Sequence, residues 1–167
     1  MQDPLIINKE TVEEIIKKSK EVSRKRALHL REYLDGGNNI GLIYNAFQMG
    51  TYVQPHKHPS DGTEIWVAQK GTVRAILFNE EGNVVQHYDI SLSDNPFLLI
   101  PAGTYHTAVA MEPDSVLCEI YLGKFNPETY KEFASWAPSE EGSEQDRERY
   151  LKKLIDETGT DQNENTL

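Results

Sequence analysis

The stretch that decides the fold runs from Gly50 to Gly71 and reads GTYVQPHKHPSDGTEIWVAQKG. His56 and His58 stand two positions apart in it, and alternate residues of a β-strand point to the same face. We therefore expect both imidazoles to project into one interior. Glu64 begins the next apolar run, so its carboxylate can reach that interior from an adjacent strand.

A second stretch, residues 97–106, reads FLLIPAGTYH. The pattern predicts a buried strand that ends at Pro101, a tight turn allowed by Gly103, and a new strand that opens with His106. This arrangement delivers a third imidazole. Three imidazoles and a carboxylate suit Fe(II), Zn, Ni, Mn or Co and leave one or two open positions on a five- or six-coordinate ion. The sequence thus predicts one divalent transition metal ion held by His56, His58, Glu64 and His106.

Hydrophobic periodicity changes to two between about residue 39 and residue 121, which is typical of β-strands. Residues 80–83 (EEGN) read as a hairpin turn between two of the strands. Many short strands at close spacing predict an antiparallel sandwich or barrel. The expected strands are Ile40–Phe47, Glu64–Val67, Thr72–Phe78, Val84–Tyr88, Phe97–Ile100, Thr107–Ala110 and Val116–Tyr121.

Both ends of the chain carry helical patterns. Residues from about 8 to 26 predict a helix with a capping box at Thr11 and Glu14, closed by the basic run Arg24–Arg26. Residues 147–155 predict a second, amphipathic helix, and we expect disorder from about Gly159 onward. The expected organisation is a helical extension over 1–38 packed on the barrel, the barrel over 39–125, and a C-terminal extension over 126–167.

Composition narrows the classes of function. The chain has 167 residues, enough for one domain, and a net charge of −10, which argues against nucleic-acid and anionic-membrane surfaces. The single cysteine, Cys118, excludes an internal disulfide and fits a reducing cytoplasm. Without a long apolar run or a signal-peptide pattern at the N-terminus, a soluble cytoplasmic protein is expected.

The two stretches resemble the paired motifs of the cupin superfamily. The first motif there reads Gly, five residues, His-x-His, three or four residues, Glu, six residues, Gly. This chain has one extra residue before Glu64. The second motif reads Gly, five residues, Pro-x-Gly, two residues, His, three residues, Asn, and here Asn95 and Ala110 replace its first and last positions. The resemblance implies an all-β core of the cupin type, a double-stranded β-helix or jelly-roll barrel, and commonly a homodimer paired through the sheets.

A narrower resemblance, to the WbuC-type cupin-fold metalloproteins, extends to about residue 141. It is carried by PHKHP at 55–59, by FASWAP at 133–138, and by the basic residues with His29 that precede the barrel. Gly123-Lys124-Phe125 departs from the Gly-Pro-Tyr of that family. Its members are often encoded among surface-polysaccharide genes, and the resemblance assigns no reaction.

Four further side chains are candidates for substrate chemistry. Arg26 and His29 can close one mouth of the barrel and bind a phosphate or carboxylate, or simply form a solvated helix end. Glu119 lies in an apolar strand, where it either faces the cavity as a general base or points outward. Tyr105 either lines the cavity as a substrate-binding residue or packs in the core.

Three functions remain open at this point. The first is a metal-dependent enzyme, an isomerase or an oxygenase, that acts on a small polar substrate such as a sugar or sugar derivative. The second is a metal-containing module that binds a small ligand without turnover. The third is a metal-independent barrel of the sugar-nucleotide epimerase type with a histidine base, which the full ligand set disfavours.

Overall fold

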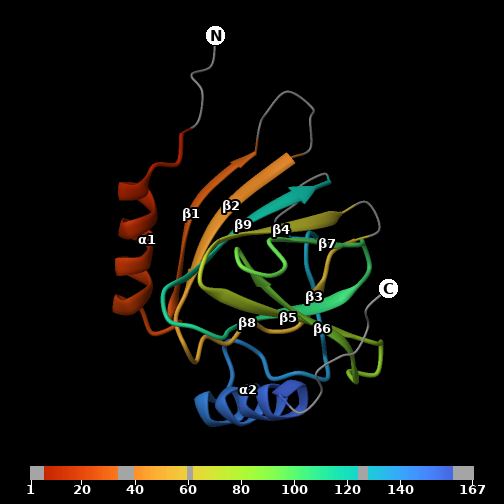
Figure 1. The fold of residues 1–167 in the computed structure, drawn as a ribbon. Helices are drawn as coiled ribbons and strands as arrows, with labels where there is room; N and C mark the ends of the chain where they lie inside the picture. The colour runs from red at the N-terminus through yellow and green to blue at the C-terminus, as the bar shows by residue number, and fades with distance from the viewer. Residues whose placement is uncertain (1–5, 34–39, 60–61, 124–127, 160–167) are drawn as a thin grey trace.

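The computed structural model describes residues 6–33, 40–59, 62–123 and 128–159, with the backbone alone for residues 29–33. Two antiparallel sheets face each other as a barrel, with one helix against each (Figure 1). The elements are α1 (Lys9–Glu21), β1 (Arg26–Tyr33), β2 (Ile40–Phe47), β3 (His56–Lys57), β4 (Thr63–Lys70), β5 (Thr72–Phe78), β6 (Val84–Ser91), β7 (Phe97–Ile100), β8 (Tyr105–Ala110), β9 (Ser115–Leu122), β10 (Glu132–Phe133) and α2 (Glu144–Gly159).

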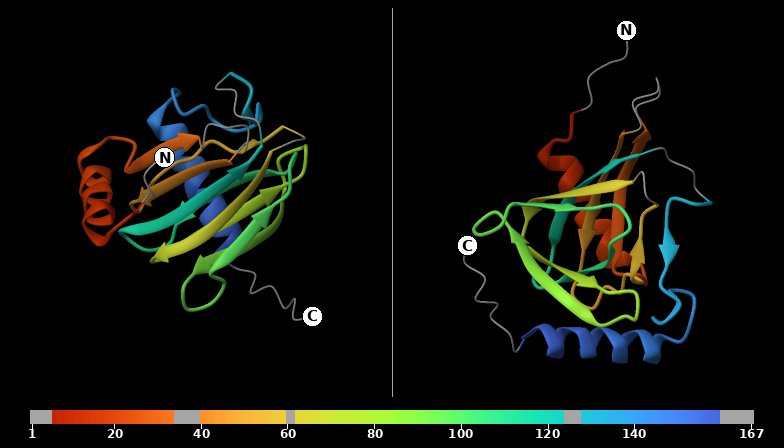
Figure 2. Two further views of the ribbon diagram at one scale, coloured as in Figure 1. Left: turned by 90° about the horizontal axis from the view of Figure 1, so that it is seen from above. Right: turned by 90° about the vertical axis from the view of Figure 1, so that its right-hand side faces the viewer.

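The strand order explains how distant segments meet. One sheet runs β1-β2-β9-β4-β7 and the other runs β10-β3-β8-β5-β6 (Figure 2). Consecutive strands repeatedly fall in opposite sheets, so each sheet collects strands that are far apart in sequence. This is the predicted jelly-roll barrel, and the seven predicted strands all form.

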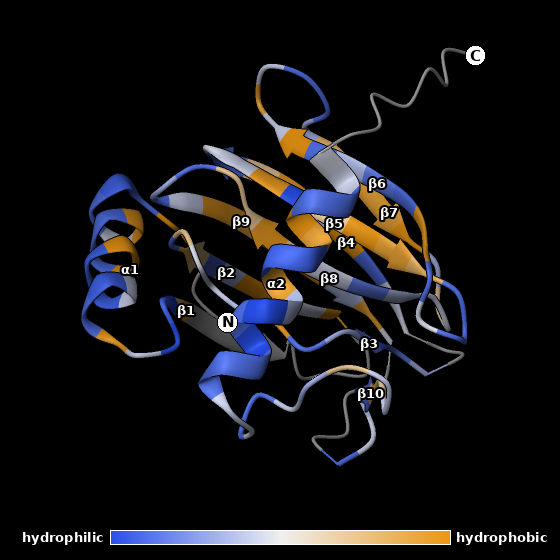
Figure 3. Ribbon diagram, turned by 90° about the horizontal axis from the view of Figure 1, so that it is seen from below, coloured by the Kyte–Doolittle hydropathy of each residue, from blue (hydrophilic) through white to orange (hydrophobic). Residues whose placement is uncertain are grey.

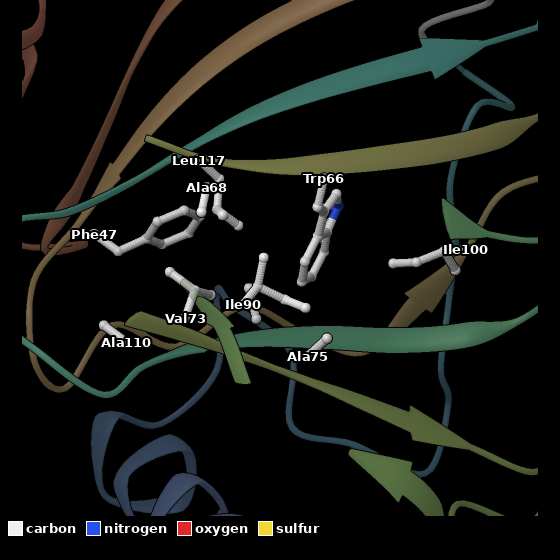
Figure 4. Close-up of a cluster of buried hydrophobic side chains, with 10 residues drawn as sticks. Phe47, Trp66, Ala68, Val73, Ala75, Ile90, Ile100, Ala110 and Leu117 are labelled. Carbon is white, nitrogen blue, oxygen red and sulfur yellow. The ribbon is translucent and has the colours of Figure 1, made fainter. Parts of the chain in front are cut away.

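The barrel interior is divided along its length. One part is a packed apolar cluster, in which the ring of Phe47 meets Leu117 and Val73 (Figure 4). Ile90 and Ile100 are fully buried in the same cluster. The inner face of β4 continues from Ala68 and Trp66, which belong to this cluster, to the buried carboxylate of Glu64. The apolar cluster therefore fixes the spacing of the two sheets beside a polar region.

The N-terminal helix is shorter than the predicted one. It begins after Asn8, whose side chain accepts the backbone N–H of Thr11, so Asn8 and not Thr11 is the cap. The helix ends at Glu21, and Lys25 adopts a left-handed conformation with φ of 53°. The predicted continuation to residue 26 is wrong, because Arg26 starts strand β1, which pairs with β2.

Helix α1 covers one part of the outer face of the first sheet. Ile15 and Ile16 pack against Ala46 of β2 and Val116 of β9. At its C-terminal end, Lys20 forms an ion pair with Asp114 at 2.8 Å. The apolar stripe of the helix is thus buried against its own barrel.

Helix α2 covers the outer face of the second sheet and presents a hydrophilic face to the solvent (Figure 3). Leu151 and Leu154 are buried against Ile76 and Phe78 of β5 in one apolar cluster. Arg74 of β5 donates to the backbone carbonyl of Thr158 at 3.1 Å, which is favourable at a helix C-terminus. The predicted helix over 147–155 is confirmed and is longer at both ends.

The hairpin at residues 80–83 supports the segment that leads into α2. Gly82 has φ of +87°, and a Cβ placed there would lie 2.6 Å from the indole ring of Trp136. Gly103 has a similar φ of +76° but open space around it. The two glycines therefore differ mainly in whether a side chain can fit.

We predict that Gly82→Ala destabilises the protein more than Gly103→Ala does. Each variant pays about 1–2 kcal/mol for a left-handed alanine, and Gly82→Ala adds roughly 1–3 kcal/mol from the clash with Trp136. Urea denaturation measures the difference. Equal losses in free energy of unfolding would contradict the packing of Trp136 on this turn.

Candidate metal centre

Three buried imidazoles come together at one end of the second sheet. His56 of β3 lies directly opposite His106 of β8 in the ladder, and His58 follows one residue after β3. The ring centroids of His56 and His106 are 4.6 Å apart, and His58 lies 5.4 Å from His106. The three rings can each offer a nitrogen, and these nitrogens all lie within 4.8 Å of one another.

Backbone carbonyls fix the orientation of each ring through its Nδ1 atom. The carbonyl oxygens of Gln54, Tyr130 and Thr104 lie 2.9, 2.7 and 2.9 Å from the Nδ1 atoms of His56, His58 and His106 respectively. A carbonyl only accepts, so each Nδ1 carries the proton and donates it. The Nε2 lone pairs are therefore left to face inward, which is the usual outer-shell arrangement of metal-binding histidines.

Glu64 reaches the same point from the other sheet. Its Oε2 atom lies 3.0 Å from His106 Nε2 and 3.3 Å from His58 Nε2. These atoms are all acceptors once Nδ1 holds the ring proton, so a cation or an additional proton must stand between them. The donor set therefore fits a divalent transition metal ion.

The pKa values of His56 and Glu64 are shifted by their burial and by their closeness to the other side chains of the cluster. Burial lowers the pKa of His56 well below its ordinary value, and the ammonium of Lys131 and the other two imidazoles lower it further. Burial acts to raise the pKa of Glu64, but the hydrogen bonds and positive charge that His106 and His58 supply when a proton stands on Nε2 lower it well below the usual range. A neutral imidazole and an ionised carboxylate are the forms that coordinate metals.

A cavity of about 300 Å³ adjoins the cluster, and both His56 and Glu64 line it. Glu119 of β9 also lines it, 8 % exposed, with Oε1 accepting a hydrogen bond of 2.8 Å from Asn45 Nδ2. Burial and the nearby charge of Glu64 raise the pKa of Glu119 to about 7. A carboxyl group that titrates near neutrality inside a cavity is suited to proton transfer.

The remaining predicted site residues fall in different places. Arg26 lines the cavity, with its guanidinium donating to Glu140 at 2.6 Å and to the carbonyl of Tyr52 at 2.5 Å. His29 lies on β1, and its side chain is outside the described residues.

Tyr105 packs on the opposite side of the second sheet from the histidines. Its hydroxyl donates to Glu132 at 2.9 Å, and its ring lies 5.6 Å from that of Trp136. It adjoins His106 on β8, and successive residues of a strand point to opposite faces. A role for Tyr105 in contacting substrate does not fit this placement.

The structure adds cavity residues that the sequence reasoning missed. Trp66 follows Glu64 by two positions on β4 and shares its face, so strand alternation could have found it. Asn45 lies on β2, where its contact with Glu119 depends on the strand order. Lys131 and Phe133 come from the segment that pairs with β3 through β10, which no local pattern indicates.

A comparison with known sequence families shows which family the chain belongs to. A family described as a domain of unknown function, DUF6016, matches residues 7–90. The chain belongs to this family. Searching the curated proteins gave no sequence match.

Solved structures show what this DUF6016 protein is similar to in fold. They include oxalate decarboxylase from Bacillus subtilis, at a TM-score of 0.51 and 16 % identity over 65 % of this chain and 27 % of that one. CapF, the capsular polysaccharide assembling protein from Staphylococcus aureus, has a TM-score of 0.52 and 14 % identity over 65 % and 29 % of the two chains. Protein SO0799 from Shewanella oneidensis has a TM-score of 0.50 and 16 % identity over 65 % and 72 %.

These neighbours are cupin-fold proteins, so the likeness shows that the DUF6016 chain has a cupin fold. The chain spans only about a quarter of the oxalate decarboxylase and CapF chains, at 27 % and 29 %. Neither helix of the described part of the chain has the length and apolar character that a membrane span requires.

We predict that replacing His56 and His58 together by Ala abolishes metal binding, because two of the three fixed Nε2 lone pairs are lost. Elemental analysis of the purified, dialysed protein measures the metal content per chain. His87→Ala is the matched control, since His87 lies on β6 outside the cluster and should leave the metal content unchanged. Undiminished metal in a folded double variant would rule out this centre.

Proposed function

We propose that this cupin is a metal-dependent enzyme that acts on a small polar substrate, such as a sugar or a sugar derivative. The observation that carries the proposal is the position of Glu119, a buried carboxyl group that lines the same cavity as His56 and Glu64 and whose pKa is raised by burial and by Glu64. The four ligand side chains alone would equally suit a metal ion that only stabilises the fold. A second, separately held carboxyl group beside it is what a reaction with proton transfer needs.

His56, His58, Glu64 and His106 are the residues that would hold the ion. A bound divalent ion supplies Lewis-acid polarisation of a substrate oxygen and, if it is redox-active iron, electron transfer. The four side chains come from both sheets, so the barrel holds them rigidly against the apolar cluster.

Glu119 would move the proton. Its Oε1 atom is held by Asn45 Nδ2, which leaves Oε2 to exchange a proton with a substrate hydroxyl or an acidic C–H. Arg26, which is half-buried and paired with Glu140, would contribute positive charge to the cavity wall and orient an anionic part of the substrate.

Two reaction types fit these residues. An isomerase would use Glu119 to move a proton between carbons with no consumption of oxygen, whereas an oxygenase would require iron and consume oxygen. An aerobic and an anaerobic screen of sugars, sugar acids and sugar nucleotides with the metal-loaded protein separates them. Saturable binding with no product would favour the non-catalytic binding module instead.

The metal-independent epimerase fits less well. It requires one histidine base, whereas here three imidazole Nε2 atoms converge with the carboxylate of Glu64 in one buried cluster. This arrangement favours coordination over proton transfer by a ring nitrogen.

We also propose the WbuC-type assignment and a link to surface-polysaccharide metabolism. The FASWAP stretch at 133–138 supports the assignment because it matches the signature of that family, and its Phe133 lines the cavity. CapF is a capsular polysaccharide assembling protein, which is consistent with the link.

A homodimer stays a prediction. The exposed apolar residues Phe97 and Leu99 on edge strand β7 favour it.

We predict that Glu119→Gln removes turnover, by at least about a hundredfold as expected for a lost general base, while metal content is retained. Activity of the wild-type enzyme should rise with pH as Glu119 loses its proton. The pKa of Glu119 is about 7 without a metal ion, and a bound cation lowers it, so the rise should lie below pH 7 in the metal-loaded enzyme. Glu81→Gln, in the exposed hairpin turn, is the matched control. Full activity of Glu119→Gln would remove Glu119 from the mechanism.

The same variant has a readout that needs no substrate. The pKa of Glu119 rises from 4.5 to about 7 on folding, so the folded protein binds more protons in that interval. Stability of the metal-free protein should therefore fall as pH rises from about 5 to 7, and Glu119→Gln should lose that part of the fall. Urea denaturation at the two pH values measures it, and identical pH profiles would contradict the burial of an ionisable group at this position.

A further inference from the structure

We propose that Trp66 and Asn45 form a donor–acceptor pair that binds a hydroxyl group of the substrate, and that the substrate is a small hydroxylated carboxylate. This inference rests on the proposed function and specifies the substrate of that site. It is carried by two buried polar atoms in the cavity wall that have no hydrogen-bond partner among the described residues.

Trp66 supplies the donor. Its side chain is buried, with 3 % exposure, and it lines the cavity with its ring 5.8 Å from that of His106 in an edge-on arrangement. Figure 4 shows the indole between Ile90 and Phe47 on one side and Ile100 on the other. Leaving an indole N–H buried without a partner is costly, since buried tryptophans usually find an acceptor. A ligand oxygen in the cavity would supply one.

Asn45 supplies the acceptor. Its Nδ2 donates to Glu119, so its amide oxygen is the atom left over, and that oxygen is buried without a partner among the described residues. Above about pH 7, or at lower pH beside a bound cation, Glu119 is ionised, and the amide then keeps this orientation because its oxygen would otherwise face a carboxylate. Asn45 therefore presents an acceptor that only a donor group of a ligand can satisfy.

The sheet register puts the two atoms on one face. Trp66 lies opposite Glu119 in the β4–β9 ladder, and Glu119 lies opposite Ile43 in the β2–β9 ladder. Asn45 is two residues from Ile43 and so shares its face. A donor and an acceptor thus flank Glu119. A hydroxyl group both accepts and donates, so a hydroxyl placed beside Glu119 has the chemistry that both atoms require, whereas a methylene has neither.

The charge of the cavity selects an anion. The described residues that line it include three cationic side chains and three carboxylates, whose formal charges cancel when all six are ionised. These are Arg24, Arg26, Lys131, Glu64, Glu119 and Glu140. Adding a divalent ion leaves an excess of positive charge in a largely buried space. A carboxylate on the ligand offsets this excess.

The test uses Zn(II)-loaded, ¹⁵N-labelled protein and two probes, D-glycerate and D-lactate. The probes share the 2-hydroxycarboxylate group and differ only in the hydroxyl at C3. The chain has two tryptophans, so its spectrum holds two indole N–H signals, and Trp66→Phe identifies that of Trp66 by its loss. We expect glycerate to move the Trp66 indole signal downfield and lactate to move it much less.

Binding affinities give the second readout. Wild-type protein should bind glycerate about tenfold more tightly than lactate, roughly what the two hydrogen bonds of the C3 hydroxyl contribute together. Trp66→Phe keeps the ring and removes the donor, and Asn45→Leu removes the acceptor, so each should lower the ratio about threefold or more. Trp136→Phe is the matched control: its indole N–H is also buried without a partner among the described residues, but it lies outside the cavity, and the ratio should be unchanged.

The outcomes separate the two proposals. If the wild-type protein holds no zinc at the histidines, the proposed function fails. If it holds zinc but binds no glycerate, or if Trp66→Phe and Asn45→Leu keep the tenfold ratio, the donor–acceptor pair is overturned while the metal centre stands. Retained zinc in both variants shows that a loss of discrimination does not come from a damaged centre.

Discussion

The constraint on which the site depends is the fixing of three imidazoles through Nδ1. Each ring gives its Nδ1 proton to a backbone carbonyl, so three Nε2 lone pairs and a carboxylate oxygen converge with no proton of their own to share. Such a group of acceptors is unfavourable in a buried space unless a cation joins it. A bound metal ion would therefore make this interior consistent with the surrounding fold.

The jelly-roll topology makes that convergence possible. His56 and His106 meet across one ladder of the second sheet, while Glu64 and Glu119 stand on neighbouring strands of the first. The apolar cluster between the sheets sets their spacing, and the two helices cover their outer faces. A polar wall with one titratable carboxyl group, one indole N–H and one amide then faces the metal ligands, which is why we assign chemistry to this end of the barrel.

Much of this could be predicted from local patterns. Alternation on a strand predicted that His56 and His58 share a face, and turn residues placed His106 at the start of the next strand. The first helix was predicted too long because the basic run Arg24–Arg26 resembles a helix end, whereas a left-handed Lys25 turns the chain into β1. For Tyr105 the sequence left open a cavity contact or a place in the core, and the inward-pointing neighbour His106 could have indicated the second.

Other features could not be predicted because they depend on which strands become neighbours. Asn45 and Glu119 are separated by 74 positions and meet only through the β2–β9 ladder. Lys131 reaches the cavity through the short β10–β3 pairing, for which two residues of sequence give no signal.

The most direct test of the metal centre is a crystal structure with anomalous diffraction measured at the absorption edge of the bound metal. We expect one anomalous peak at about 2.0–2.2 Å from the Nε2 atoms of the three histidines and from a carboxylate oxygen of Glu64. A peak bound through Nδ1, or metal-containing crystals with no peak between His56, His58 and His106, would contradict the account.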